Sequence, residues 1–313
     1  MIHSLFSQLA QTIVIVALAP LMLGWVRQCR AWLQNRKGAG VLQPYRVLHK
    51  LFHKDAVIAE SASSLFRVAP YVQFGCMALV ASIVPVLATD LPFAAAADVI
   101  ALVGLLGLAR LFAALAAMDI GTSFGSMGAR REMLVAFLSE PALLMVFFTP
   151  SLIAHSTSLP TIVSTLAHRD FVLYPSMAFA AVAFYMVALA ENARIPIDNP
   201  STHLELTMIQ EAQVLEYSAR HLALIEWASA IKLMNYSVIG LALFLPWGIV
   251  EAEWTLMPVA LAALLVKLAL GGAALALLET LSAKLRIFRA PEFLGTAFML
   301  AVLGMLIRLA LEQ

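Results

Sequence analysis

Ionisable side chains of both signs lie inside or beside the long apolar segments of this chain. They are Arg110, Glu140, Glu191, Glu226, Lys232, Lys267 and Glu279, with Asp119 just outside one segment. An ionised group in hydrocarbon costs at least about 2.5–3.5 kcal/mol on insertion scales. Burial shifts such groups towards their neutral forms, so carboxylates and amines there can exchange protons near neutral pH. The pattern predicts an internal polar path for protons, in which carboxylates and cations are partners.

The composition is that of a membrane protein. The 313 residues are 62% hydrophobic and 12% charged, whereas a soluble domain is about 45–50% apolar and about 25% charged. The net charge of +1 gives no indication of a nucleic-acid partner. Two cysteines, Cys29 and Cys76, are too few for a four-cysteine iron–sulfur cluster or a structural zinc site. We therefore expect an all-α polytopic protein without a metal site of its own.

About eight segments are long enough to cross a bilayer, which takes about 20 apolar residues. They are 7–26, 68–89, 98–118, 133–153, 172–190, 222–248, 256–279 and 292–311. An even number of crossings places both termini on the same side of the membrane. We expect one integral membrane domain that spans residues 1–313.

Basic residues predict the orientation of this domain. Lysine and arginine concentrate in the alternate loops 27–67, 119–132 and 280–291, whereas loops 90–97 and 249–255 carry acids only. The positive-inside rule then places the basic loops in the cytoplasm and both termini outside.

Two of the cytoplasmic loops, which follow the first and fifth helices, are too long to be simple connectors. In the loop 27–67, the stretch from Gln43 to Phe52 is amphipathic and could lie along the membrane interface. The loop 191–221 is acidic, so an anionic membrane surface would repel it. A partner protein or an internal cavity is the better interpretation of this second loop.

The expected topology gives approximate depths for the embedded charges. Arg110 and Glu140 both lie roughly 10–12 Å from the cytoplasmic ends of consecutive helices, so they could form an ion pair. Lys267 is roughly 17–18 Å from either end of its helix and needs a partner or water. A structural role for the Arg110–Glu140 pair and an interfacial role for Glu191 and Glu279 also fit the sequence.

Three motifs in successive loops carry a family resemblance. They are Arg36–Arg46 (RKGAGVLQPYR), Asp119–Phe124 (DIGTSF) with Gly128–Glu132 (GARRE) and Glu140-Pro141, and Glu191–Asp198 (ENARIPID) with Glu205-Leu206 and Glu216–Ser218 (EYS). In order and over the whole chain they resemble the membrane subunit shared by respiratory complex I (NADH dehydrogenase subunit 1) and the group 4 membrane-bound [NiFe] hydrogenases. The hydrogenase branch includes formate hydrogenlyase subunit 4 and hydrogenase 4 component C.

The resemblance implies a bacterial or archaeal plasma-membrane subunit of an oxidoreductase complex, without a redox centre of its own. The implied partners are a hydrophilic iron–sulfur subunit, a large hydrogenase-like subunit that could hold NiFe, antiporter-like membrane subunits and the lipid bilayer. The implied proton path comprises Glu140, Glu191, Asp198, His203, Glu205, Glu216, Glu226, Lys267 and Glu279. The implied docking residues for the hydrophilic arm are Arg36, Lys37, Arg46, Lys50, Asp119, Arg130 and Arg131.

Departures from the complex I pattern weigh against quinone as a ligand. Ile197 stands in place of a phenylalanine, and Ser201 and His203 stand where that pattern has acids. The hydrogenase branch is therefore the leading hypothesis, ahead of a quinone-site subunit of a complex I-type dehydrogenase. A stand-alone secondary transporter and a purely structural anchor are two further hypotheses, although the chain lacks the internal repeat that many transporters show.

Overall fold

The computed structural model describes residues 2–86, 97–168, 174–198, 208–248, 257–285 and 287–311. Its helices are α1 (Ile2–Leu33), α2 (Gln43–Phe52), α3 (Ser64–Ile83), α4 (Val99–Asp119), α5 (Ser123–Ala154), α6 (Leu159–His168), α7 (Pro175–Glu191), α8 (Gln210–Val214), α9 (Ala219–Phe244), α10 (Met257–Leu281), the 3-10 helix η2 (Ile287–Arg289) and α11 (Ala290–Leu311). The predicted all-α polytopic class is confirmed.

Seven helices in the described ranges are long and apolar enough to cross a membrane: α1, α3, α4, α5, α9, α10 and α11. The eighth expected segment is α7, which is apolar but has only 17 residues. At 1.5 Å per residue it is roughly 25 Å long, somewhat less than the roughly 30 Å hydrocarbon core. Each of the eight apolar segments predicted from the sequence overlaps one helix, although the bounds differ by up to ten residues.

Two of the expected loops contain more helix than their composition indicated. The amphipathic stretch Gln43–Phe52 is α2, with Pro44 in its first turn. Most of the loop expected at 119–132 is the beginning of α5, where the Thr122 hydroxyl accepts a hydrogen bond from the Gly125 N–H at 3.3 Å. This polar first part of α5 has no long apolar run, so hydrophobicity alone did not reveal it.

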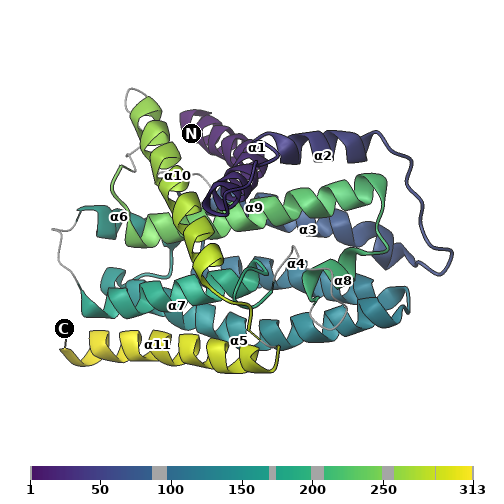
Figure 1. Ribbon diagram of the computed structural model, residues 1–313. Coiled ribbons are helices and arrows are strands. Elements are labelled where there is room, and N and C mark those ends of the chain that lie inside the picture. Colours follow the sequence, from purple (N-terminus) through teal and green to yellow (C-terminus); the bar gives the residue numbers. More distant parts are fainter. Residues whose placement is uncertain are drawn as a thin grey trace.

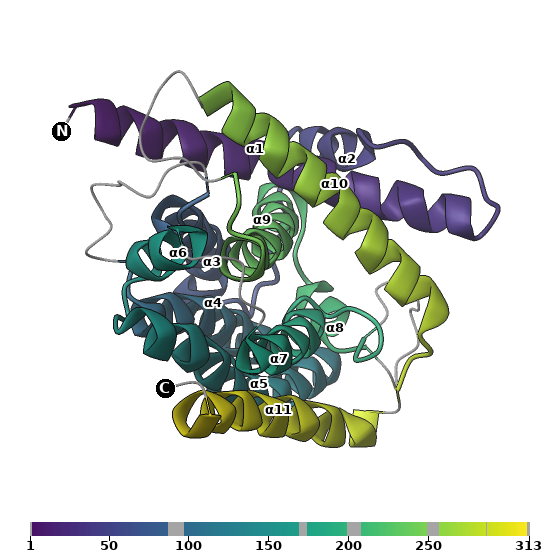
Figure 2. The ribbon, with the colours of Figure 1, turned by 90° about the vertical axis from the view of Figure 1, so that its left-hand side faces the viewer.

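The helices form a bundle in which α11 packs against α7 and α5, and α3 packs against α4 and α9. Figure 1 shows α5, α7, α9 and α11 running roughly side by side, whereas α10 crosses them at a steep angle. Figure 2 shows α1 and α10 crossing each other on one side of this bundle. The two helices are joined there by a hydrogen bond, in which the indole N–H of Trp25 on α1 donates to the Ala269 carbonyl of α10 at 2.9 Å.

Polar side chains fasten helices to one another and cap a helix end. The buried amide of Asn235 on α9 donates to the Met77 carbonyl of α3 at 2.9 Å. Asp98 caps α4 through the Ile100 N–H at 2.7 Å, and its other oxygen accepts from Thr157 at 2.6 Å. The hydrogen bond from Thr157 holds the pKa of the Asp98 carboxyl below its usual range.

The contact of α1 with the chain before α2 generates a prediction on stability. A Cβ atom at Gly24 would lie 1.9 Å from the Val41 carbonyl oxygen, whereas a Cβ at Gly104 on α4 would meet nothing within 4 Å. Gly24→Ala should therefore destabilise the protein by about 1–3 kcal/mol through overpacking. The matched variant Gly104→Ala should cost nothing, because alanine favours helix over glycine. Thermal unfolding of the purified protein checks this, and equal midpoints for the two variants would contradict it.

Candidate functional site

A buried ion network occupies the middle of the bundle. The Arg110 guanidinium on α4 forms an ion pair with Glu191, the last residue of α7, and its Nη1 donates to the Ser139 hydroxyl at 3.1 Å. Ser139 in turn donates to Glu191 Oε1 at 2.5 Å. Arg110 and Glu191 are both buried, so each needs the other to offset the loss of water.

Three further side chains complete this network. Lys232 on α9 places its ammonium 3.2 Å from Glu191 Oε2, which gives that carboxylate two cationic partners. Glu132 on α5 lies 3.0 Å from Arg110 Nε, and Glu140 lies 3.9 Å from Nη1 of the same guanidinium. Glu140 is more accessible than Glu191, with 40% of its side-chain surface exposed against 3%. The network therefore runs from an accessible carboxylate to a buried one.

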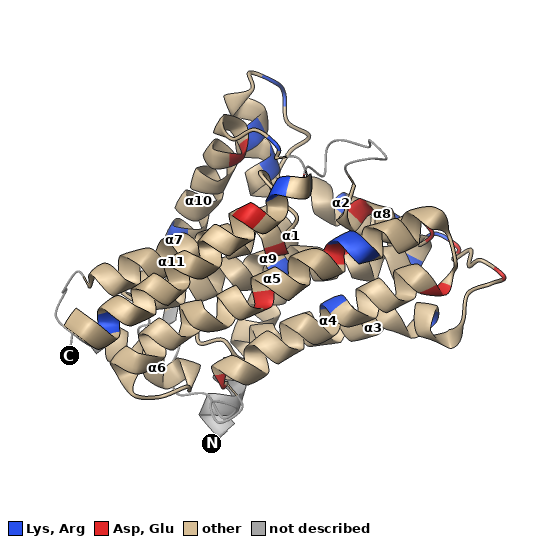
Figure 3. Ribbon diagram, turned by 90° about the horizontal axis from the view of Figure 1, so that it is seen from below, with Lys and Arg blue, Asp and Glu red and all other residues tan. Residues whose placement is uncertain are grey.

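The expected Arg110–Glu140 contact is thus present, but Glu191 and Glu132 are closer to the guanidinium. Sequence reasoning placed Glu132 in a loop and gave Ser139 no role. The signal for both residues was their position in the motifs: Glu132 follows Arg131, and Ser139 directly precedes Glu140. Figure 3 shows charged residues of both signs in the middle of the apolar helices. Others lie at one end of the bundle.

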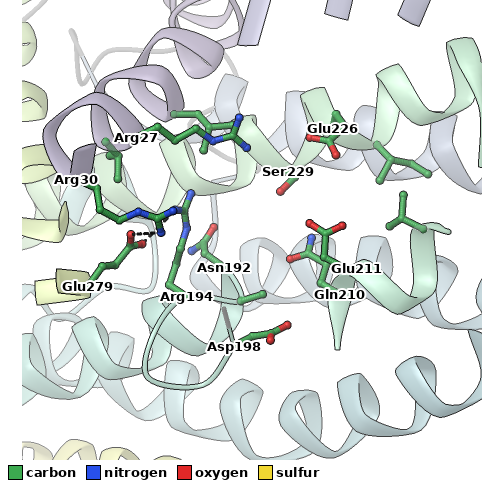
Figure 4. Close-up of a pocket in the computed structure, with 15 residues that line it drawn as sticks. Arg27, Arg30, Asn192, Arg194, Asp198, Gln210, Glu211, Glu226, Ser229 and Glu279 are labelled. Carbon is green, nitrogen blue, oxygen red and sulfur yellow. Dashed lines mark hydrogen bonds and ion pairs between the residues drawn. The ribbon is translucent and has the colours of Figure 1, made fainter. Parts of the chain in front are cut away.

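A second charged cluster surrounds a cavity of about 360 Å³ between α1, α8, α9, α10 and the chain after α7. Glu279 of α10 is buried and pairs with Arg194 at 3.1 Å and with Arg30 at 3.5 Å. Burial lowers the pKa of the Arg194 guanidinium, and the Glu279 carboxylate opposes that shift. Figure 4 shows the Arg30 and Arg194 side chains next to each other beside Glu279.

The segment between α7 and α8 holds Asp198 at the edge of this cavity. Asp198 Oδ1 accepts from the Lys284 ammonium at 2.9 Å, and Oδ2 accepts from the Ile209 N–H at 3.2 Å. Glu226 also lines the cavity, on a different face of α9 from Lys232, as their spacing of six residues predicted. His203 and Glu205 lie outside the described residues.

Lys267 is held by backbone carbonyls. Its ammonium donates to the Leu245 carbonyl at 2.7 Å and to the Trp247 carbonyl, and it lies 4.6 Å from the centre of the Trp247 ring. Leu245 is the C-cap of α9, where carbonyl groups lack partners within the helix. The geometry therefore joins α10 to the end of α9, which is a contact that the sequence did not indicate.

The residues expected to dock a hydrophilic arm fall into two groups. Five are exposed on the first loop, α2 and the start of α5: Arg36, Lys37, Arg46, Lys50 and Arg130. The other two form hydrogen bonds within this chain: Arg131 donates to the Met208 carbonyl at 2.8 Å, and Asp119 accepts from the Ser63 N–H at 2.9 Å. Glu216, expected in the proton path, is exposed beyond α8.

The difference in burial within the ion network predicts unequal costs of substitution. Arg110→Met leaves the Glu191 carboxylate buried with one cationic partner fewer, and should destabilise the protein by about 3–5 kcal/mol. Glu140→Gln removes a more exposed, 3.9 Å contact and should cost about 1 kcal/mol or less. Thermal unfolding in detergent compares the two variants, and an equal loss in both would contradict the assignment of Glu191 as the buried centre.

Comparisons with known proteins agree with this architecture. The chain is 32% identical to formate hydrogenlyase subunit 4 of Escherichia coli (strain K12) over 310 residues, which is 98% of this chain and 99% of that protein. It is 37% identical to hydrogenase-4 component C of the same organism over 241 residues, 77% and 75% of the two chains. An NADH-quinone oxidoreductase subunit of Solibacter usitatus (strain Ellin6076) is 28% identical over 273 residues, 79% and 65% of the two chains.

A solved structure shares the fold. A chain of the membrane-bound sulfane sulfur reductase, an archaeal respiratory membrane complex, superposes with a TM-score of 0.83 at 19% identity and covers 96% of this chain and 97% of its own. The family model described as NADH dehydrogenase matches residues 7–310. The chain therefore belongs to the NADH dehydrogenase family of membrane subunits.

Proposed function

We propose that this chain is the membrane anchor and proton-path subunit of a proton-translocating redox complex of the membrane-bound hydrogenase or formate hydrogenlyase type. It is a membrane subunit of a complex I-like respiratory complex, and its redox centres reside in partner subunits. The single observation that carries the proposal is the ion network around Glu191, in a chain that belongs to this family.

The proton path in this proposal starts from the geometry of the network. Glu140 is accessible, Glu191 is buried, and the Ser139 hydroxyl and the Lys232 ammonium both contact Glu191. Hydroxyl, carboxylate and amine groups in contact can pass a proton along a chain of hydrogen bonds, and ionisable groups inside membrane helices are used in this way in proton relays. Asp198, Glu226 and Glu279 line the cavity that Asn192, the residue after Glu191, also lines, and in this proposal they supply an entry to the path. The remaining candidates are Lys267, His203, Glu205 and Glu216.

The relatives favour the hydrogenase type over the quinone-reducing type. Identity to formate hydrogenlyase subunit 4 and hydrogenase-4 component C is 32% and 37%, against 28% and 25% for two NADH-quinone oxidoreductase subunits. A quinone-site subunit is the second candidate, and sensitivity of the native complex to quinone-site inhibitors would favour it.

Docking of the hydrophilic arm is proposed for the exposed basic residues of the first loop, α2 and the start of α5. Arg36, Arg46, Lys50 and Arg130 present their charges to solvent, where they can meet an acidic partner surface. Such contacts at the rim of an interface steer association and weaken as the salt concentration rises.

Composition of the native assembly tests the proposal. The complex is purified from its own membranes in mild detergent through a tag on this chain, and its subunits and metals are identified. We expect an iron–sulfur subunit, a large hydrogenase-like subunit and antiporter-like subunits, with iron and nickel present. A preparation in which this chain is active on its own, without iron-containing subunits, would refute the proposal. Iron without nickel would contradict the hydrogenase type and indicate a complex of the same family that passes its electrons to another acceptor.

A further inference from the structure

Two cavities in the described part of the chain have walls in common. The charged cavity of about 360 Å³ and a second, mostly apolar cavity of about 280 Å³ share Asn192 and Arg194 in their walls. On α10, Lys267, Gly271 and Leu275 line the apolar cavity and Glu279 lines the charged one. These four residues are spaced by four and share one face of the helix. The two cavities therefore lie next to each other, between α1 and α10 on one side and α7 and α9 on the other, and we refer to them together as the slot.

The charged end of this slot carries opposite charges on opposite walls. Arg27 on α1 and Glu226 on α9 both line the cavity and lie on opposite sides of it in Figure 4. Among the described residues, neither has an oppositely charged atom within 4 Å, although the two attract each other across the space between them. Arg194, which pairs with Glu279 through Nη1, adds a second guanidinium on the Arg27 side. A guanidinium has five N–H groups in a fork that suits phosphate oxygens. The cavity thus matches a ligand with a phosphate on one side and an ammonium on the other.

The middle of the slot holds buried polar atoms without partners. Tyr185 Oη and Asn192 Oδ1 make no hydrogen bond to any described residue, although the Asn192 amide nitrogen donates to the Ala188 carbonyl at 2.8 Å. Both residues line the apolar cavity, and Asn192 also lines the charged one. A buried unpaired hydroxyl or amide costs about 1–3 kcal/mol, so a ligand with ester or glycerol oxygens at this depth would stabilise the site.

Beyond Tyr185 the lining of the slot is mostly apolar. Lys267 also lines it, one helical turn from Gly271, and its ammonium donates to the Leu245 and Trp247 carbonyls. Phe184, Gly240 and Phe244 of α7 and α9 face Leu268 and Leu275 of α10 across the slot. Gly271 leaves space here, because a Cβ atom at this position would meet nothing within 4 Å. This lining suits a hydrocarbon chain that lies along the helices.

We propose that the slot binds one phospholipid with an ethanolamine headgroup. Its phosphate lies against Arg27 and Arg194, its ammonium against Glu226, its ester oxygens beside Tyr185 and Asn192, and one acyl chain between α10 and α7. The order of charges, hydrogen-bonding atoms and apolar surface along the slot follows the order of groups in such a lipid. A lipid with only anionic charge would leave Glu226 unpaired, and a quinone would leave both Glu226 and Arg27 unpaired.

Lipid competition tests the site on the purified complex. The complex, stripped of weakly held lipid, is exposed to mixed micelles that contain phosphatidylethanolamine, phosphatidylglycerol and a menaquinone in equal amounts, and the retained molecules are identified by native mass spectrometry. We expect one phosphatidylethanolamine per copy of this chain. Arg27→Gln should weaken its retention about tenfold, the effect of losing one hydrogen bond to a charged group. Glu226→Gln should reduce the preference over phosphatidylglycerol by a similar factor.

A matched pair of glycine variants separates binding from folding. Gly271→Leu places a side chain in the apolar part of the slot and should abolish retention, whereas Gly104→Leu on α4 fills space outside the slot and should leave it unchanged. Leucine favours helix over glycine at both positions, so both variants should fold. Retention of the menaquinone, equal retention of phosphatidylglycerol by the wild type, or equal retention by the two glycine variants would each overturn the proposal.

Discussion

The buried carboxylate of Glu191 sets the main constraint on this structure. An ionised carboxylate that is cut off from water is stable only where cations and hydrogen-bond donors surround it. Arg110 from α4, Lys232 from α9 and Ser139 from α5 converge on it for that reason. Because Glu191 ends α7, this one group fixes the relative positions of four helices. It also places both signs of charge in the middle of an otherwise apolar bundle.

The chain directly after Glu191 connects this network with the cavity. Asn192 and Arg194 line the cavity, and Arg194 pairs with Glu279 of α10. The Asp198 carboxylate accepts a hydrogen bond from the Ile209 N–H, which lies directly before α8. The proton-path proposal and the lipid proposal thus concern two neighbouring regions of the same polar layer. They share Glu226, which lines the cavity and is used in both. Otherwise the first proposal depends on Glu191 and its partners, and the second on Arg27 and the face of α10, so each has its own test.

Hydrophobicity, helix length and depth made much of this fold predictable. Each span had to cover the bilayer, so eight apolar runs sufficed to locate eight helices, and the amphipathic pattern located α2. Their distances from the ends of their helices predicted that Arg110 and Glu140 lie at the same depth in the membrane. Depth could not show which carboxylate is closest, because Glu191 is 81 residues away from Arg110 in the sequence. The partners of Lys267 were equally hidden, since they are backbone carbonyls at the end of α9 and carbonyls carry no signal in a sequence.

The ratio of protons moved to electrons transferred tests the central claim most directly. Membrane vesicles that carry the assembled complex with Glu191→Gln are compared with the wild type and with Glu60→Gln, which removes an exposed acid between α2 and α3 that has no place in the proposed path. The account predicts that Glu191→Gln keeps electron transfer but loses most proton movement, and that Glu60→Gln leaves the ratio unchanged. An unchanged ratio in assembled Glu191→Gln complexes would contradict it, and would leave the buried network with a purely structural role.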